Sequence, residues 1–299
     1  MKKGSIVVPL GVALISSFIY GVWNVLSYSL VKFLPGNILI SLFLMMGFGA
    51  VLSLLYLFAA SIKNGKSMTL EFIKYPVVGG CLFALGNIIF FSMIRVEVLP
   101  IVAAIVYSNL IIFSLILIKG KGSSISFRYV LGTVIAVLGL AFIELLNTGK
   151  IVINLLLIEQ SILLVILYAF GSYFIYKSSL SKEKAENNIF LIFLTETAVI
   201  GAIALVYGGF RGLTGFSGSY IFEVIITGAV LMLAVILEFK SFFIISQYKT
   251  KFINMINIFL NFETIWVLIF SILFFSVSSL GIIIGVVITS FGIWLVSAS

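Results

Sequence analysis

The chain has 299 residues, of which 62% are hydrophobic and 9% are charged, and its mean hydropathy is +1.31. Soluble domains carry about 45–50% apolar and about 25% charged residues, so this composition excludes a soluble globular protein and a disordered one. The sequence contains no histidine and no aspartate, and its one cysteine is Cys81. A Ser-His-Asp triad, a Cys-His pair and a histidine-bound metal are therefore excluded. We expect an integral membrane protein that is not an enzyme and has no cofactor or metal.

Ten apolar segments are long enough to cross a bilayer as helices, which takes about 17–25 residues each. The runs 4–31, 33–62 and 264–299 contain no charged residue at all. The apolar runs are continuous and do not alternate, which excludes the strands of a β-barrel. In chain order, the predicted helices cover residues 5–28, 38–62, 74–94, 98–118, 128–146, 155–177, 188–209, 220–246, 250–274 and 279–297.

Lysine and arginine are distributed unevenly between the two sides that these ten helices define. Thirteen fall on the side of the N-terminus, four fall on the other side, and Lys240 lies within a helix. Because cytoplasmic loops are rich in lysine and arginine, we expect both termini in the cytoplasm and the protein in the cytoplasmic membrane. The net charge of +8 follows from this topology and implies no nucleic-acid partner. The expected partners are the lipid bilayer and a small-molecule substrate, with a monomer or a weak dimer as the oligomeric state.

The two halves of the chain resemble each other at a nearly constant offset. Tyr20 in the first helix corresponds to Tyr168 in the sixth, 148 residues later, and Gly132 corresponds to Gly285 at an offset of 153. A Phe-Phe pair in the third helix recurs in the eighth at 152. Five helices per copy place the second copy upside down in the membrane, as in many secondary transporters. We therefore predict an all-α membrane protein of ten transmembrane helices, built as two inverted five-helix repeats, residues 1–148 and 149–299.

Three short motifs lie in the first, fifth and tenth predicted helices: Gly21-x-Trp23-Asn24, Gly132-x6-Gly139 and Gly281-x3-Gly285-x6-Gly292. With the ten helices and the cytoplasmic ends, they resemble the ten-helix, EamA-like branch of the drug/metabolite transporter superfamily. That family often has proline within helices four and nine and glutamate closing them. Here the fourth helix has Pro100 only at its start, the ninth has no proline, and neither has the closing glutamate. The resemblance implies export or exchange of amino acids, drugs or other small metabolites through a central cavity.

Four charged side chains lie clearly within the predicted membrane segments, where a charge costs roughly 2.5–3.5 kcal/mol on insertion scales. Glu196 and Lys240 lie at similar depths on adjacent helices and could form an ion pair, whether structural or functional. Glu238 and Lys240 are two residues apart, so they point to nearly opposite faces and only one can face a cavity. Lys240 is favoured, because it alone has an opposite charge at matching depth. Glu196, Glu238 and Glu263 are candidates for proton coupling, since burial favours the protonated form of a carboxyl group.

Polar residues gather on one face of the first predicted helix. This face runs from Ser16 to Ser27, includes Tyr20, Trp23 and Asn24, and lies within about 100° of arc. In lipid a polar face turns inward, so we expect it to line the cavity. In the third helix, Asn87 is the one strongly polar side chain, and it is either a helix-packing residue or a ligand contact.

The ninth and fourth predicted helices leave alternatives open. Asn257 and Asn261 share a face of the ninth helix, and Glu263 lies roughly 140° from the middle of that face. The asparagine face is favoured for the site because amides both donate and accept hydrogen bonds, with Glu263 then contacting neighbouring helices. In the fourth helix, Tyr107 and Asn109 point to different faces, and the sequence does not decide between them.

These observations favour a secondary transporter that moves a small polar or amphipathic metabolite, such as an amino acid or a drug-like compound, by alternating access, as an exporter or exchanger. A non-transporting membrane scaffold or a channel subunit is the alternative, and an intramembrane transferase is the third. No nucleotide-binding loop is present, which excludes ATP-driven transport by this chain alone. The candidate substrate-binding residues are Tyr20, Trp23, Asn24, Asn87, Tyr107, Tyr168, Lys240, Asn257 and Asn261.

Overall fold

The computed structural model describes residues 7–33, 37–64, 73–120, 122–148, 155–179, 185–207, 217–246, 253–277 and 279–299. Within these ranges the chain forms helices and no strands. The helices are α1 (Val7–Phe33), α2 (Ile38–Asn64), α3 (Lys74–Val96), α4 (Leu99–Tyr107), α5 (Asn109–Gly120), α6 (Phe127–Thr148), α7 (Leu155–Ser179), α8 (Ala185–Val206), α9 (Gly218–Ser246), α10 (Ile253–Leu260), α11 (Phe262–Phe275) and α12 (Leu280–Ser297).

Nine helical segments of the described chain are long and apolar enough to cross a membrane. One consists of α4 and α5, interrupted only at Ser108, and another consists of α10 and α11, interrupted only at Asn261. Both interrupting residues keep helical backbone angles, with φ −61° and ψ −13° at Ser108 and φ −61° and ψ −20° at Asn261. The remaining helix, α6, is apolar over the shorter stretch Phe127–Ile143. The protein is therefore an all-helical, multi-pass membrane protein.

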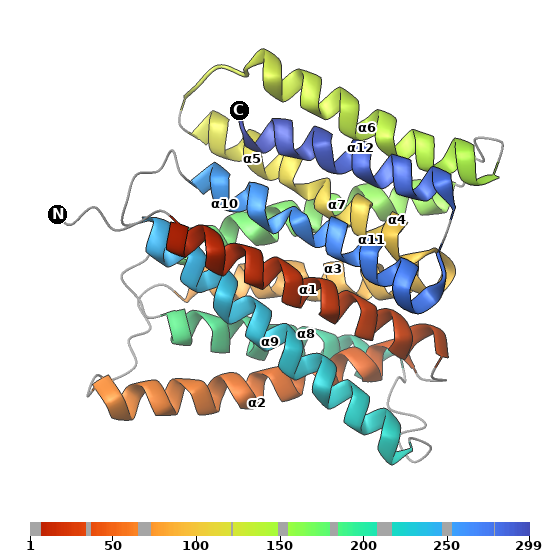
Figure 1. Cartoon of the computed structure of the whole chain (residues 1–299). Helices are drawn as coiled ribbons and strands as arrows, with labels where there is room; N and C mark the ends of the chain where they lie inside the picture. Colours follow the sequence, from red (N-terminus) through yellow and green to blue (C-terminus); the bar gives the residue numbers. More distant parts are fainter. Residues whose placement is uncertain are drawn as a thin grey trace.

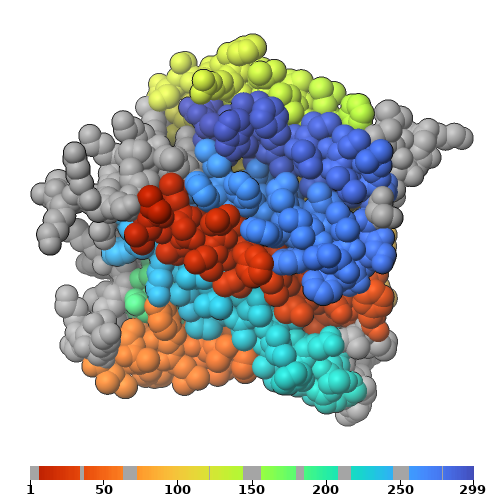
Figure 2. Space-filling view, in the orientation of Figure 1, coloured from red at the N-terminus to blue at the C-terminus, as the bar shows by residue number. Residues whose placement is uncertain are grey.

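Helices that are distant in the sequence are neighbours in the bundle. α1 packs against α9, α2 against α8, α3 against α7, and α6 against α12. The pair of α6 and α12 lies at one side of the molecule and α2 at the opposite side (Figure 1). α1 begins at the same end of the bundle at which α12 terminates. The space-filling view shows α1, α9, α11 and α12 covering one face together (Figure 2).

The side chains are distributed as in a protein surrounded by lipid, with apolar side chains outside and polar side chains inside. Large apolar side chains point outward, among them Val51, Leu55 and Leu273, which is 68% exposed. Polar side chains lie inside, including Asn24 and Glu263, which is only 2% exposed. Because a bilayer offers no hydrogen bonds to its solutes, this inverted arrangement keeps polar atoms away from the hydrocarbon.

Glycines let the backbones of α6 and α12 touch. A Cβ atom at Gly132 would lie 2.6 Å from the carbonyl oxygen of Gly292, and one at Gly285 would lie 2.8 Å from that of Gly139. Any larger residue at these positions would separate the two helices, because small residues are what allow such close approach in a membrane. These four glycines are thus packing positions.

Most of the basic residues that carry the predicted topology lie outside the described residues, as does residue 149 at the proposed start of the second repeat. The cations in question are Lys2, Lys3, Lys66, Lys121, Lys150, Lys182, Lys184, Arg211, Lys249 and Lys251.

Candidate functional site

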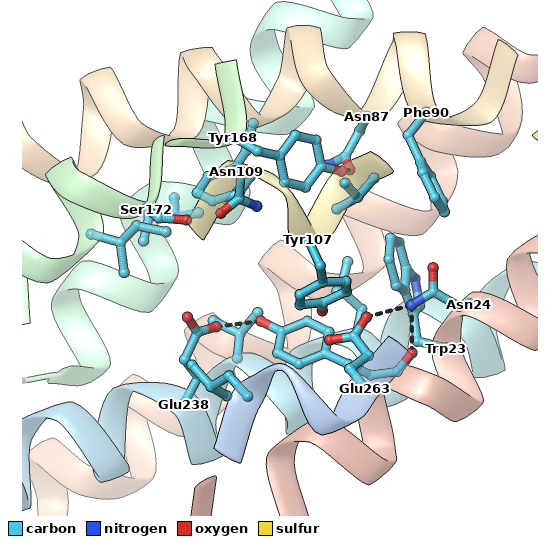
Figure 3. A pocket seen from close by; sticks show the side chains of 18 of the residues that line it. Trp23, Asn24, Asn87, Phe90, Tyr107, Asn109, Tyr168, Ser172, Glu238 and Glu263 are labelled. Atoms are coloured by element: carbon cyan, nitrogen blue, oxygen red, sulfur yellow. Dashed lines mark hydrogen bonds between the residues drawn. The ribbon is translucent and has the colours of Figure 1, made fainter. Parts of the chain in front are cut away.

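A cavity lies inside the bundle, between helices from both halves of the chain. The volume of the cavity that the centres of water molecules can occupy is about 110 Å³. This is enough for several water molecules. Its polar lining comes from α1, α3, α4, α5, α7, α8, α9 and α11. Figure 3 shows Glu238 and Glu263 on one wall, opposite a wall that carries Asn87, Tyr168, Asn109 and Ser172.

The first wall is organised by two residues of α1 that lie one turn apart. The Tyr20 hydroxyl donates a hydrogen bond of 2.6 Å to Oε2 of Glu238 on α9. Asn24 Nδ2 donates one of 2.5 Å to Oε1 of Glu263 on α11 and one of 2.9 Å to the Tyr20 carbonyl oxygen. Residues four apart on a helix lie on the same face, so a single face of α1 contacts two glutamates of the second half. We name Glu238 and Glu263 the acidic wall.

The opposite wall contains a chain of hydrogen bonds that ends at the third glutamate. The Tyr168 hydroxyl on α7 donates a bond of 2.6 Å to Oδ1 of Asn87 on α3. Asn87 Nδ2 in turn donates a bond of 3.1 Å to Oε2 of Glu196 on α8. Tyr168 thus fixes the orientation of the Asn87 amide, so that its NH₂ group faces the carboxyl group. Gly86 makes room for this arrangement, because a Cβ there would lie 2.5 Å from the Tyr168 ring.

Aromatic rings form much of the remaining lining. The Trp23 ring stacks on Phe90 with a centroid distance of 5.6 Å and an interplanar angle of 19°. Tyr20 meets Trp23 edge to face at 6.4 Å, and Phe83 meets Tyr168 in the same way at 5.1 Å. Such rings add apolar area with little conformational freedom, so the cavity combines stiff apolar walls with a few polar groups.

Most residues that the sequence singled out come together here. The residues from both predicted groups that line this cavity are Tyr20, Trp23, Asn24, Asn87, Tyr107, Tyr168, Glu196, Glu238 and Glu263. Of the rest of the polar face of α1, Ser16 instead donates a hydrogen bond of 3.0 Å to the Ala234 carbonyl oxygen on α9, so it serves helix packing.

Lys240 does not reach the cavity. The expectation that it faces inward in preference to Glu238 is wrong, because Lys240 is exposed on α9 and Glu238 lines the cavity. The expected ion pair with Glu196 is wrong as well, since the bonding partner of that carboxyl group is Asn87. The two α9 residues do point to opposite faces, as their spacing predicted, and the hydrogen bond from Tyr20 holds Glu238 on the inner face.

The choice between the two faces of the ninth span also goes against the expectation. Asn257 and Asn261 are buried but lie away from the cavity. Asn261 Nδ2 donates a hydrogen bond of 2.9 Å to the Ser290 carbonyl oxygen on α12, so the asparagine face packs against that helix. Glu263, on the other face, is turned into the cavity.

In the fourth span both alternatives apply, since Tyr107 and Asn109, which flank the interruption at Ser108, line the cavity together. Several lining residues, most of them apolar, were not predicted from the sequence. Ser172 could have been predicted, because it lies 148 residues after Asn24, the same spacing that separates Tyr20 from Tyr168. The apolar lining residues could not, because they do not stand out in a sequence that is mostly apolar. The missed residues are Phe83, Phe90, Val106, Leu110, Ser172, Ile175, Ile192, Phe193, Leu231, Val235 and Leu260.

Comparison with known proteins places the fold and goes no further. No family model matches the chain, and no curated protein matches it either. Fourteen chains of solved structures match the fold. One of them, a crystal structure of a protein, covers 95% of this chain and 95% of its own, with a TM-score of 0.63 and 14% sequence identity. At that identity the likeness shows a shared fold alone.

Proposed function

We propose that the protein is a secondary transporter that moves a small polar or amphipathic metabolite across the cytoplasmic membrane by alternating access. The observation that carries the proposal is the polar cavity, whose three glutamates are each hydrogen-bonded to a residue of the other half of the chain. A scaffold has no use for three carboxyl groups inside the bundle, since each is costly to place in a membrane. Ligand sites of secondary transporters lie between repeats, and this cavity is lined by helices of both halves of the chain.

We further propose that the two halves are inverted five-helix repeats of the EamA-like type. The neighbour relations support this, because exchanging the halves exchanges equivalent contacts: α1 with α9 becomes α7 with α3, and both pairs pack. The contact of Gly132 with Gly292 likewise becomes that of Gly285 with Gly139.

Two further features support the same symmetry. The interruptions at Ser108 and Asn261 are 153 residues apart, the offset that also relates the glycines of α6 and α12. Tyr20 and Tyr168 both donate a hydrogen bond to a polar residue of the third helix in the other half, Glu238 and Asn87. A chain that crosses the membrane an even number of times has both ends on the same side. This agrees with α1 beginning at the end of the bundle at which α12 terminates (Figure 1).

In the proposed cycle, one half rocks against the other and opens the cavity to each side of the membrane in turn. Both termini lie in the cytoplasm, and the working unit is a monomer or a weak dimer. The hydrogen bonds of Glu196, Glu238 and Glu263 cross between the halves, so they must rearrange when the halves move. These carboxyl groups are therefore the candidates for coupling substrate movement to protons.

Alternating access is testable with thiol chemistry, because the chain has one cysteine, Cys81, which is half-buried on α3. A Cys81→Ala, Ser172→Cys variant in sealed vesicles places a single thiol on the cavity wall. A membrane-impermeant maleimide should label it from either side, and a bound substrate should slow both reactions. Cys81→Ala alone is the background control. Labelling from one side only, under every gradient applied, would contradict the proposal, as would the absence of flux for amino acids, amines and organic acids in proteoliposomes.

A further inference from the structure

The charge of the cavity is one-sided. Among the residues that line it, three are glutamates and none is lysine or arginine. The nearest cation along α9, Lys240, is turned to the outside. Carboxylates left together in a low-dielectric site repel one another unless protons or a cation compensate them. The cavity is therefore built for positive charge, and it would oppose an anion.

One carboxylate oxygen lacks a partner. Oε1 of Glu263 accepts the hydrogen bond from Asn24, but Oε2 is buried and has no hydrogen bond within the described structure. Leaving a buried acceptor without a partner is unfavourable, and more so when the acceptor is charged. Since Glu263 lines the cavity and is 2% exposed, a donor that enters the cavity is what would satisfy this oxygen.

The aromatic lining suits the same kind of ligand. The faces of tryptophan and tyrosine attract cations within about 6 Å of the ring centre, and Trp23, Tyr20 and Tyr107 all line the cavity. Trp23 is also stacked on Phe90, which holds its ring in place. A ligand with an ammonium or guanidinium group and an apolar body could donate hydrogen bonds to the carboxylate oxygens at one end. Its apolar body could then lie against the aromatic rings.

We propose that the cavity selects a small organic cation, whose ammonium or guanidinium group binds at Glu238 and Glu263 while its apolar body lies against Trp23 and Tyr107. This inference rests on the proposed function, because it names the substrate class of the same site. It reverses the expectation from the sequence, in which Lys240 held a carboxylate or phosphate.

Protons compete with such a cation. The titratable groups that line the cavity are Tyr20, Tyr107, Tyr168, Glu196, Glu238 and Glu263. A protonated glutamate no longer attracts the ammonium group, so binding should strengthen as the pH rises and weaken as it falls. Exchange of the cation for protons would follow from this competition.

The test is a binding measurement on the purified full chain, which does not depend on transport. Three probes of similar shape differ in charge: 2-phenylethylammonium, 2-phenylethanol and 3-phenylpropionate. Quenching of tryptophan fluorescence and isothermal calorimetry report their binding. We expect the ammonium probe to bind at least about tenfold more tightly than the alcohol, the propionate to bind least, and the preference to shrink at acidic pH.

Variants test whether Glu238 and Glu263 cause the preference for the ammonium probe over the alcohol. Glu238→Gln and Glu263→Gln should each weaken ammonium binding by at least about tenfold and leave binding of the alcohol nearly unchanged. Glu223→Gln removes a carboxyl group on α9 that does not line the cavity, and it serves as the matched control. Retained binding of the alcohol by the two glutamine variants separates the loss of charge from a folding defect.

Each outcome decides between the two proposals. Equal binding of ammonium and alcohol, a preference for the propionate, or ammonium binding weaker than about 10 mM would overturn the cation site and leave transport of another substrate possible. Tight, glutamate-dependent ammonium binding without flux in proteoliposomes would support the cation site and defeat the transporter.

Discussion

The two walls of the cavity occupy equivalent places in the proposed repeats, yet their chemistry differs. Tyr20 and Tyr168 both reach across to the third helix of the other half, where one meets the carboxyl group of Glu238 and the other the amide of Asn87. We call the opposite wall, with Asn87, Asn109, Tyr168 and Ser172, the amide wall; its one carboxyl group, that of Glu196, accepts a hydrogen bond from Asn87. The proposed repeats thus share their helix contacts and differ in the polar side chains that face the cavity. If the two halves are repeats, this difference would let a symmetric arrangement of helices hold a polar ligand in one orientation.

The largest expected effect comes from adding a second carboxyl group to the amide wall. Asn87→Asp removes the amide that donates to Glu196 and places a second carboxyl group beside it. We expect the free energy of unfolding to fall by about 3–5 kcal/mol, the usual result of an uncompensated buried charge. The loss should be greater at alkaline pH, where the added group is ionised. Thermal unfolding in detergent at acidic and alkaline pH measures this, with Asn87→Gln as the control that keeps the amide.

An equal melting temperature of Asn87→Asp and the parent protein at alkaline pH would mean that water or a cation already compensates charge on that wall. The two walls would then differ in residue composition, but the difference would not affect the free energy of unfolding.

The reverse change makes the acidic wall neutral. Glu238→Gln keeps an oxygen that can accept the Tyr20 hydrogen bond and removes a carboxyl group from inside the bundle, so stability should stay within about 1 kcal/mol of the parent or rise. Transport should nevertheless fall by at least about tenfold. Parallel measurement of thermal unfolding and proteoliposome flux separates the two effects. A variant that loses stability and keeps its flux would show that Glu238 is structural.

The two tyrosines provide a more direct contrast, which is measured as the difference between two stability costs. Tyr20→Phe removes a donor to a carboxyl group and should cost about 1.5–3 kcal/mol, whereas Tyr168→Phe removes a donor to an amide and should cost about 0.5–1.5 kcal/mol. Denaturant titration of both variants in the same detergent gives the difference. Equal costs would argue that Glu238 is already protonated and behaves as a neutral partner.

The smallest effect is expected outside both walls. Lys240→Met changes an exposed residue two positions from Glu238, so stability should change by no more than about 0.5 kcal/mol and flux should persist. Loss of flux in a proteoliposome assay would return Lys240 to the site, as the sequence alone suggested.

The contrast between Glu238 and Lys240 shows how far sequence reasoning extends. Hydropathy predicts where helices begin and end, because the bilayer imposes a length on each of them. Periodicity predicts which residues share a face, and the opposite directions of these two residues are confirmed. It cannot predict which face turns inward, because that depends on neighbours brought close by folding. Tyr20, more than two hundred positions away, decides it for α9, and α12 decides it for the ninth span through Asn261.

The glycine contact between α6 and α12 has a consequence for motion. Helices whose backbones touch have no side-chain layer between them, so neither can slide along the other without first being lifted away. If the halves rock, this contact is the pivot, and displacement grows with distance from it. The pair of α2 and α8, on the far side of the bundle (Figure 1), then travels farthest. Spin labels on that pair would report the cycle, whereas labels on α6 and α12 would keep a constant separation throughout.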